Sequence, residues 1–202
     1  MLHDAFHFSS LVWDWPIAIY LFLLGISAGA TSLSVLLRRK GAGSESGIIK
    51  ATAILAPVSV VLGLLILIFH LARPWTFWKL MFHYQFDSVM SMGVMLFQVY
   101  MAVLFAWLAV VFRTEIERLR GHLLQEKFAF VDDLIAWLAR IERLLAPLLL
   151  LLAVLLGAYT GFLLSALKTY PLLNNPVLPV LFLISGVSSG IASTILLAVT
   201  LF

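Results

Sequence analysis

A few ionisable side chains lie at the edges of long apolar runs, where charged groups are costly. His70 ends one run, Asp87 comes just before another, and Asp14 precedes the first. Ionisable groups in or beside membrane-spanning segments are rare and concentrate at functional sites. Imidazole and carboxylate groups accept protons near neutral pH, so these residues are candidate bases for a reaction that releases protons.

Hydroxyl side chains near the same run ends supply hydrogen bonds. Ser88 and Ser91 follow Asp87, and Tyr159 lies in the second half of a later run. A quinol loses two protons as it loses two electrons, so its pocket needs apolar walls, hydrogen-bond partners for two oxygens, and nearby bases. The residue types therefore favour a quinol-oxidising site, with His70 and Asp87 as catalytic proton acceptors and the hydroxyls as oxygen ligands.

Each of these residues also has a structural explanation. Asp14 and Asp87 can cap helices, because a carboxylate near a helix N-terminus is stabilised by the unpaired N–H groups there. Arg73 and Lys79 can reach lipid headgroups, and the tryptophans beside them fit an interfacial aromatic belt. A structural membrane anchor without its own quinone site therefore stays open as the alternative.

Five apolar runs are long enough to position these side chains as membrane-spanning helices. The sequence has 202 residues, of which 63% are hydrophobic and 11% are charged. About 20 apolar residues cross the hydrocarbon layer as a helix, and this composition excludes a soluble globular domain. We expect an all-α integral membrane protein with spans at residues 16–37, 48–71, 88–112, 144–167 and 177–202.

The basic residues predict the orientation of the spans. Ten of the thirteen lysines and arginines fall in the connectors after the first and third runs, and such residues are retained on the cytoplasmic side. We therefore place the N-terminus outside, together with the segment that carries His70 and Asp87. The connector 113–143 has apolar positions at three- and four-residue steps, so we expect one or two cytoplasmic amphipathic helices there.

Two short glycine-containing motifs resemble each other. GISAGATS at 25–32 and GVSSGIAS at 186–193 share both glycines and two serines. If they mark a repeat, residues 1–171 form an N-terminal four-helix transmembrane bundle and residues 172–202 begin a second, missing bundle. We then expect a sequence truncated after the fifth helix, or a partner that supplies the rest. Alternatively, both motifs serve only close helix packing.

Several other classes of chemistry are disfavoured. The sequence has no cysteine, which excludes thiolate-bound iron–sulfur clusters and sulfur-ligated zinc. Only one predicted span holds a histidine at useful depth, so we expect no haem between two histidines. The sequence also lacks a phosphate-binding glycine loop and a nucleophile triad. A transporter is disfavoured because the polar groups gather at one rim rather than at the bilayer midplane.

Three long segments are similar to a known family. They are WDWPIAIYLFLLGISAGA, HLARPWTFWKLMFHYQFDSVMSMG and LGAYTGFLLSALKTYPLLNNPVLPVLF. These segments closely resemble the NrfD/polysulfide reductase membrane-anchor family, and within it the membrane subunits of formate-dependent nitrite reductase systems. The resemblance runs over nearly the whole sequence and is weakest in the connector from 113 to 143.

The resemblance implies a quinol-oxidising electron-transfer subunit of a nitrite reductase complex rather than a stand-alone enzyme. Family members look like two four-helix bundles in the bacterial inner membrane, hold no tightly bound cofactor, and oxidise menaquinol near the outer face. Electrons then pass to a periplasmic ferredoxin-like iron–sulfur subunit and onward to multihaem cytochromes that reduce nitrite. Membrane lipid is the other expected partner, and nucleic acid is not one.

The resemblance also implies particular site residues. The quinone pocket of the family corresponds here to Asp14, Tyr20 and Tyr159, and the polar positions beside it correspond to His70 and to Asp87 with Ser88. One departure concerns the first span. The polysulfide branch places an asparagine and a histidine there, where this sequence has Ile17 and Tyr20.

Overall fold

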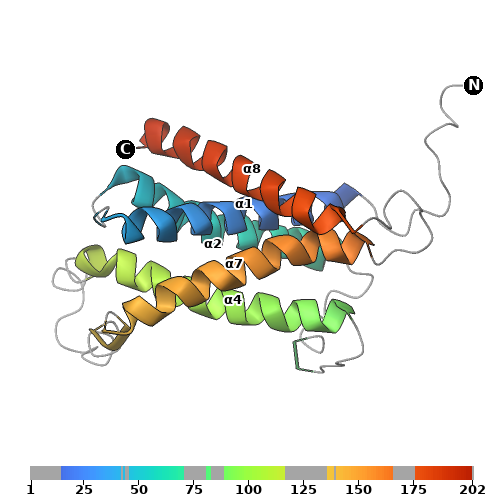
Figure 1. Cartoon of the computed structure of the whole chain (residues 1–202), viewed down its shortest axis with the longest axis horizontal. Coiled ribbons are helices and arrows are strands. Elements are labelled where there is room, and N and C mark those ends of the chain that lie inside the picture. Colours follow the sequence, from blue (N-terminus) through green and yellow to red (C-terminus); the bar gives the residue numbers. More distant parts are fainter. Residues whose placement is uncertain are drawn as a thin grey trace, which may run out of the picture.

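Five long helices make up most of the computed structural model. They are α1 (Trp15–Arg39), α2 (Gly47–His70), α4 (Val89–Val111), α7 (Glu142–Ser165) and α8 (Leu178–Leu201) (Figure 1). The structure describes residues 15–41, 43, 46–70, 81–82, 89–116, 136–138, 140–165 and 176–201, and none of these is in a strand.

All five helices are long and apolar enough to cross a membrane. Each begins and ends within two residues of the span expected from the sequence. Pro57 lies inside α2 and Pro147 inside α7, and both helices continue through the proline. The predicted all-α class with five candidate membrane spans is therefore confirmed.

α1 is the most enclosed of the five helices. It contacts α2, α7 and α8, and it lies between α7 and α8 in Figure 1. Of its membrane-spanning stretch, 67% is buried, against 17% for α8. Residues 25–34 of α1 are mostly glycine, alanine, serine and threonine. Because lipid tails give helices no hydrophobic reason to associate, such small residues promote packing by letting backbones approach closely.

The two glycine motifs pack directly against each other. A Cβ added to Gly25 would lie 3.3 Å from the Cα of Gly186, and one added to Gly190 would lie 2.6 Å from the backbone nitrogen of Ala30. Residue numbers increase in the same direction along both helices, so α1 and α8 are parallel (Figure 1). The two motifs therefore pack closely on each other, and both their origin as a repeat and the alternative that they serve packing alone stay predictions.

A second close contact joins α7 to the beginning of α8. A Cβ added to Gly161 would lie 2.5 Å from the Cα of Pro179, and one added to Gly157 would lie 2.9 Å from Cδ1 of Leu183. α8 therefore packs on both α1 and α7, and it also contacts α2. The division into a first bundle at 1–171 and the start of a second at 172–202 stays a prediction.

Ion pairs join neighbouring helix ends at what we call the basic end. Arg38 near the end of α1 pairs with Glu142 at the start of α7. Lys50 near the start of α2 donates a 2.7 Å hydrogen bond to Glu115, just beyond α4. The ends of α1 and α4 therefore lie beside the starts of α2 and α7, as successive membrane crossings require. Placement of this end in the cytoplasm, with the N-terminus outside, stays a prediction.

The connector 113–143 is shorter than the sequence suggested. α7 begins at Glu142, so this carboxylate belongs to a spanning helix and not to the connector. The prediction of amphipathic helices falls largely on residues 117–135, which lie outside the described residues.

Gly29 tests the contact between α1 and α8. A Cβ at this position would overlap the carbonyl oxygen of Gly186 and lie 2.9 Å from the Cα of Val187. Gly29→Ala must therefore push the two helices apart, and we expect its unfolding free energy in detergent micelles to fall by about 1–3 kcal/mol. The control is Gly43→Ala, because a Cβ there meets nothing within 4 Å. Equal stability of the two variants would contradict the contact.

Candidate functional site

Tyr159 on α7 lies against Gly93 on α4. A Cβ added to Gly93 would overlap the Cζ and hydroxyl oxygen of Tyr159. Gly93 is buried and Tyr159 is partly buried. The absence of a side chain at position 93 is therefore what makes room for the phenol between α4 and α7.

Tyr20 brings a second phenol from α1. Its Cδ2 would lie 3.3 Å from a Cβ added to Gly63 on α2, and the side chain packs against the apolar core. Tyr159 is on α7, which contacts α1, so the two phenols belong to neighbouring helices. Two of the predicted quinone-binding residues are therefore on contacting helices that are far apart in the sequence.

Both phenols lie toward the end of the helices that is remote from the arginines. Tyr20 is near the start of α1 and Tyr159 near the finish of α7, each within about two turns of that end. Ser91 is partly buried and lies two residues before Gly93, so it is at a similar level. His70 is the last residue of α2 and lies at this same end.

Part of the predicted site lies outside the described residues. This applies to Asp14, Asp87 and Ser88, and to the side chain of His70. The described part offers two phenols and a serine hydroxyl among apolar helices. Phenol and serine hydroxyls can each donate and accept a hydrogen bond, which suits them to holding the oxygens of an aromatic ligand.

A line of polar side chains runs along α1 toward the basic end. The Tyr100 hydroxyl lies 2.8 Å from both Ser27 Oγ and Thr31 Oγ1, and all three side chains are buried. Further along, Trp107 Nε1 donates to Ser34 Oγ at 3.4 Å. A buried polar group without a partner is unfavourable in apolar surroundings. These bonds therefore favour one rotation of α4 about its axis relative to α1.

The predicted site did not include this line, although the spacing of its residues carries a signal. Positions 27, 31, 34 and 38 follow steps of four, three and four, which place them on one helix face. Tyr100 and Trp107 are seven residues apart on α4 and so share a face as well. Matching polar stripes in two spans predict an inter-helix contact without specifying a ligand.

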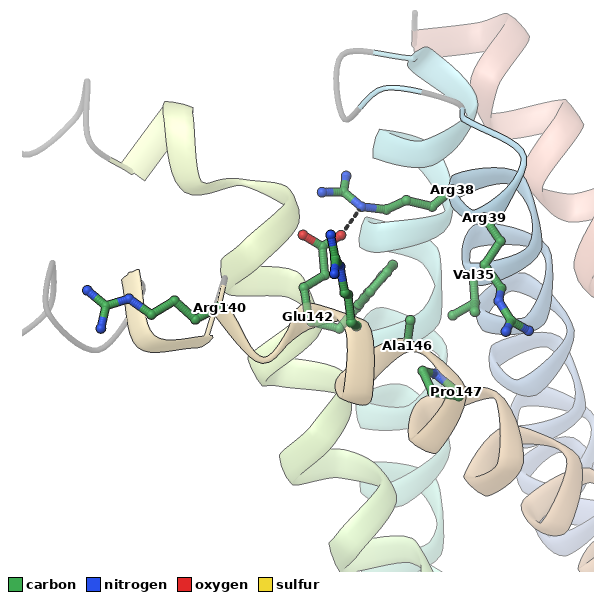
Figure 2. A pocket seen from close by; sticks show the side chains of 9 residues that line it. Val35, Arg38, Arg39, Arg140, Glu142, Ala146 and Pro147 are labelled. Carbon is green, nitrogen blue, oxygen red and sulfur yellow. Dashed lines mark hydrogen bonds and ion pairs between the residues drawn. The ribbon is translucent and has the colours of Figure 1, made fainter.

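A cavity lies where this line reaches the basic end. Its volume is about 720 Å³, and four arginines, Glu142 and Trp107 are among the residues that line it. Arg38 extends from α1 toward Glu142 on α7 (Figure 2). The Arg38 guanidinium carbon is also 5.6 Å from the centre of the Trp107 ring. This cavity is at the other end of the helices from Tyr20 and Tyr159, so it is a separate feature.

Comparison with known proteins gives the family of this protein. The family described as polysulphide reductase, NrfD, matches residues 3–202. The chain belongs to the NrfD family. It is 62% identical over 192 residues to Protein NrfD of Escherichia coli, 57% over 195 residues to a Protein NrfD homolog of Haemophilus influenzae, and 44% over 199 residues to a polysulfide reductase subunit of Wolinella succinogenes.

These matches cover almost all of this sequence but not all of the relatives. The three matches cover 94%, 95% and 96% of this sequence. In the same order, they cover 60%, 60% and 61% of the relatives. The chain therefore spans about 60% of the length of these NrfD-family proteins. It is a multi-pass protein of the bacterial inner membrane, as the sequence predicted.

Tyr100 tests the polar contact between α1 and α4. Tyr100→Phe removes one hydroxyl and leaves those of Ser27 and Thr31 without this partner. We expect the unfolding free energy in micelles to fall by about 1–2 kcal/mol. Thr200→Val is the control, because Thr200 is exposed and bonds only carbonyls of its own helix among the described residues. An equal loss of unfolding free energy in Thr200→Val would show that the buried contact does not stabilise the protein more than an exposed hydroxyl does.

Proposed function

We propose that this NrfD-family protein is the quinol-oxidising membrane subunit of a reductase complex. The placement of Tyr20 on α1 and Tyr159 on α7, toward the same end of two contacting helices, carries the proposal. The positive-inside rule assigns that end to the outer half of the membrane, and protons released there would leave to the outside. Family membership supports the same view, because one relative is named as part of polysulfide reductase.

The proposed reaction is the two-electron oxidation of menaquinol. Menaquinol gives menaquinone, two protons and two electrons, and each proton needs an acceptor near its oxygen. We assign Tyr20 and Tyr159 as hydrogen-bond partners of the two ring oxygens, with Ser91 and Ser88 as further quinone-binding residues. We assign His70 and Asp87 as the proton acceptors and Asp14 as a further quinone-binding residue.

The electrons leave to a partner, because the sequence has no cysteine to hold a cluster of its own. We propose a periplasmic ferredoxin-like iron–sulfur subunit as the first electron acceptor. It would pass the electrons to multihaem cytochromes, which would reduce nitrite. Menaquinol is then a substrate, and the protein holds no cofactor tightly. The protein itself binds and orients the menaquinol ring and accepts the two protons.

A structural anchor without a quinone site is the second candidate. One observation favours it: the cavity of about 720 Å³ lies at the basic end and not beside the phenols. An anchor would still need close helix packing and the buried α1–α4 contact. It would not need a phenol fitted against Gly93.

Binding of a fluorescent quinol analogue separates the two candidates. We expect the purified protein to quench a quinolone N-oxide saturably. Tyr159→Phe should weaken binding about two- to tenfold, because one hydrogen bond to the ligand is lost. Thr200→Val is the control and should bind like the wild type, because Thr200 is exposed on α8 and, among the described residues, bonds only carbonyls of its own helix. Absence of saturable quenching would favour the anchor.

The proton acceptors are tested separately from ring binding. In the complex, we expect His70→Ala and Asp87→Asn to abolish quinol-dependent reduction of the partner while membrane insertion stays normal. Because neither side chain is proposed to hold the ring, analogue binding should change little. Normal turnover in both variants would reject their assignment as bases and leave the phenol site standing.

A further inference from the structure

The cavity at the basic end takes no part in the proposed quinol oxidation. We propose that it binds the phosphate headgroup of an anionic phospholipid. The cavity lies between the end of α1, the inner part of α4 and the start of α7 (Figure 2). The proposal stands apart from the proposed quinol site, which lies at the other end of the same helices.

The charge of the cavity is strongly positive. Arg38, Arg39, Arg140 and Arg143 line it, against the single carboxylate of Glu142. Arg38 already pairs with that carboxylate. The other three arginines are exposed, and the described part of the molecule gives them no ion pair. Guanidinium groups bind phosphate oxygens in pairs of hydrogen bonds, so a phosphate is the complementary ligand.

Several contacts hold the floor of the cavity together. Arg38 extends across to Glu142, and its guanidinium lies over Trp107, which is 1% exposed. Trp107 is in turn bonded to Ser34 on α1. Arg39 and Arg140 stand on opposite sides of this floor, with Arg140 extending outward from the rim (Figure 2). A ligand would therefore meet a fixed base and two to three long, adaptable side chains.

Apolar surface continues from the cavity along the helices. Val35, Ala146 and Pro147 form part of its lining. On α7, four exposed leucines at steps of four, three and four lead away from it toward the bilayer centre: Leu144, Leu148, Leu151 and Leu155. A phosphate at the arginines would thus have an apolar stripe beside it for acyl chains.

The position of the cavity favours a lipid over a soluble anion. It lies where α1 and α7 cross from apolar to charged sequence, which is the level of lipid headgroups. Ala146 and Pro147 are part of a membrane-spanning helix. Basic pockets between helices on the cytoplasmic side are suited to anionic headgroups such as that of cardiolipin. A free phosphate would contact the arginines but not the apolar part of the lining, whereas a lipid would contact both.

Lipid binding to the delipidated protein in detergent tests the proposal. We expect native mass spectrometry and thermal unfolding to show retention of, and stabilisation by, cardiolipin, with little effect from phosphatidylcholine. The double variant Arg140→Gln, Arg143→Gln should bind cardiolipin about 25-fold more weakly, because each arginine near the headgroup contributes a factor of about five to the affinity. Both side chains are exposed, so without lipid the variant should unfold at the wild-type temperature.

Two controls make the test specific. Lys40→Gln removes a charge at the same end but not from the cavity lining, and we expect it to bind cardiolipin within about twofold of wild type. Millimolar inorganic phosphate should neither stabilise the protein nor displace the lipid. Unchanged cardiolipin binding by the double variant would overturn the proposal. Stabilisation by phosphate alone, or equal retention of phosphatidylcholine, would overturn it too.

Discussion

The rest of the structure depends on the close packing of α1 against its neighbours. In hydrocarbon, helices gain no free energy from hiding apolar side chains, so they associate through backbone proximity and internal hydrogen bonds. α1 meets both requirements, with glycines that admit α8 at Gly186 and Gly190 and with hydroxyls that meet Tyr100 of α4. Larger side chains on α1 would prevent its close packing against α8, and loss of its hydroxyls would remove its hydrogen bonds to α4. Either change would alter the position of Tyr20.

The same helices carry different chemistry at their two ends. Near one end, Tyr159 fits into the space left by Gly93, and Tyr20 lies toward the same end of the neighbouring helix α1. At the other, Arg38, Glu142 and Trp107 form a charged floor under further arginines. A membrane separates these environments, so one suits a proton-releasing site and the other suits anionic headgroups. The first end uses the space that Gly93 leaves, and the second is lined by arginines.

The sequence predicted the helices well because hydrocarbon thickness and apolar run length decide them directly. It also predicted that residues 25–32 and 186–193 are related, but the motifs alone could not show that they touch, since that depends on helix rotation and register. The pairing of Tyr159 with Gly93 was not foreseen for the same reason: a missing side chain gives no signal until its neighbour is known. The Arg38–Glu142 pair was hidden by counting Glu142 as part of a connector. Predictions for Asp14, Asp87 and Ser88 remain predictions.

Labelling with a photoreactive quinone would locate the quinol site on the helices. The protein in native membranes would be irradiated with an azido-menaquinone analogue, with and without excess menaquinone, and the modified peptides mapped by mass spectrometry. A quinol site between the phenols predicts competed labels in the first two turns of α1 and around Tyr159 of α7. Competed labels at residues 140–147 of the basic end, or labels that excess menaquinone does not reduce, would contradict it.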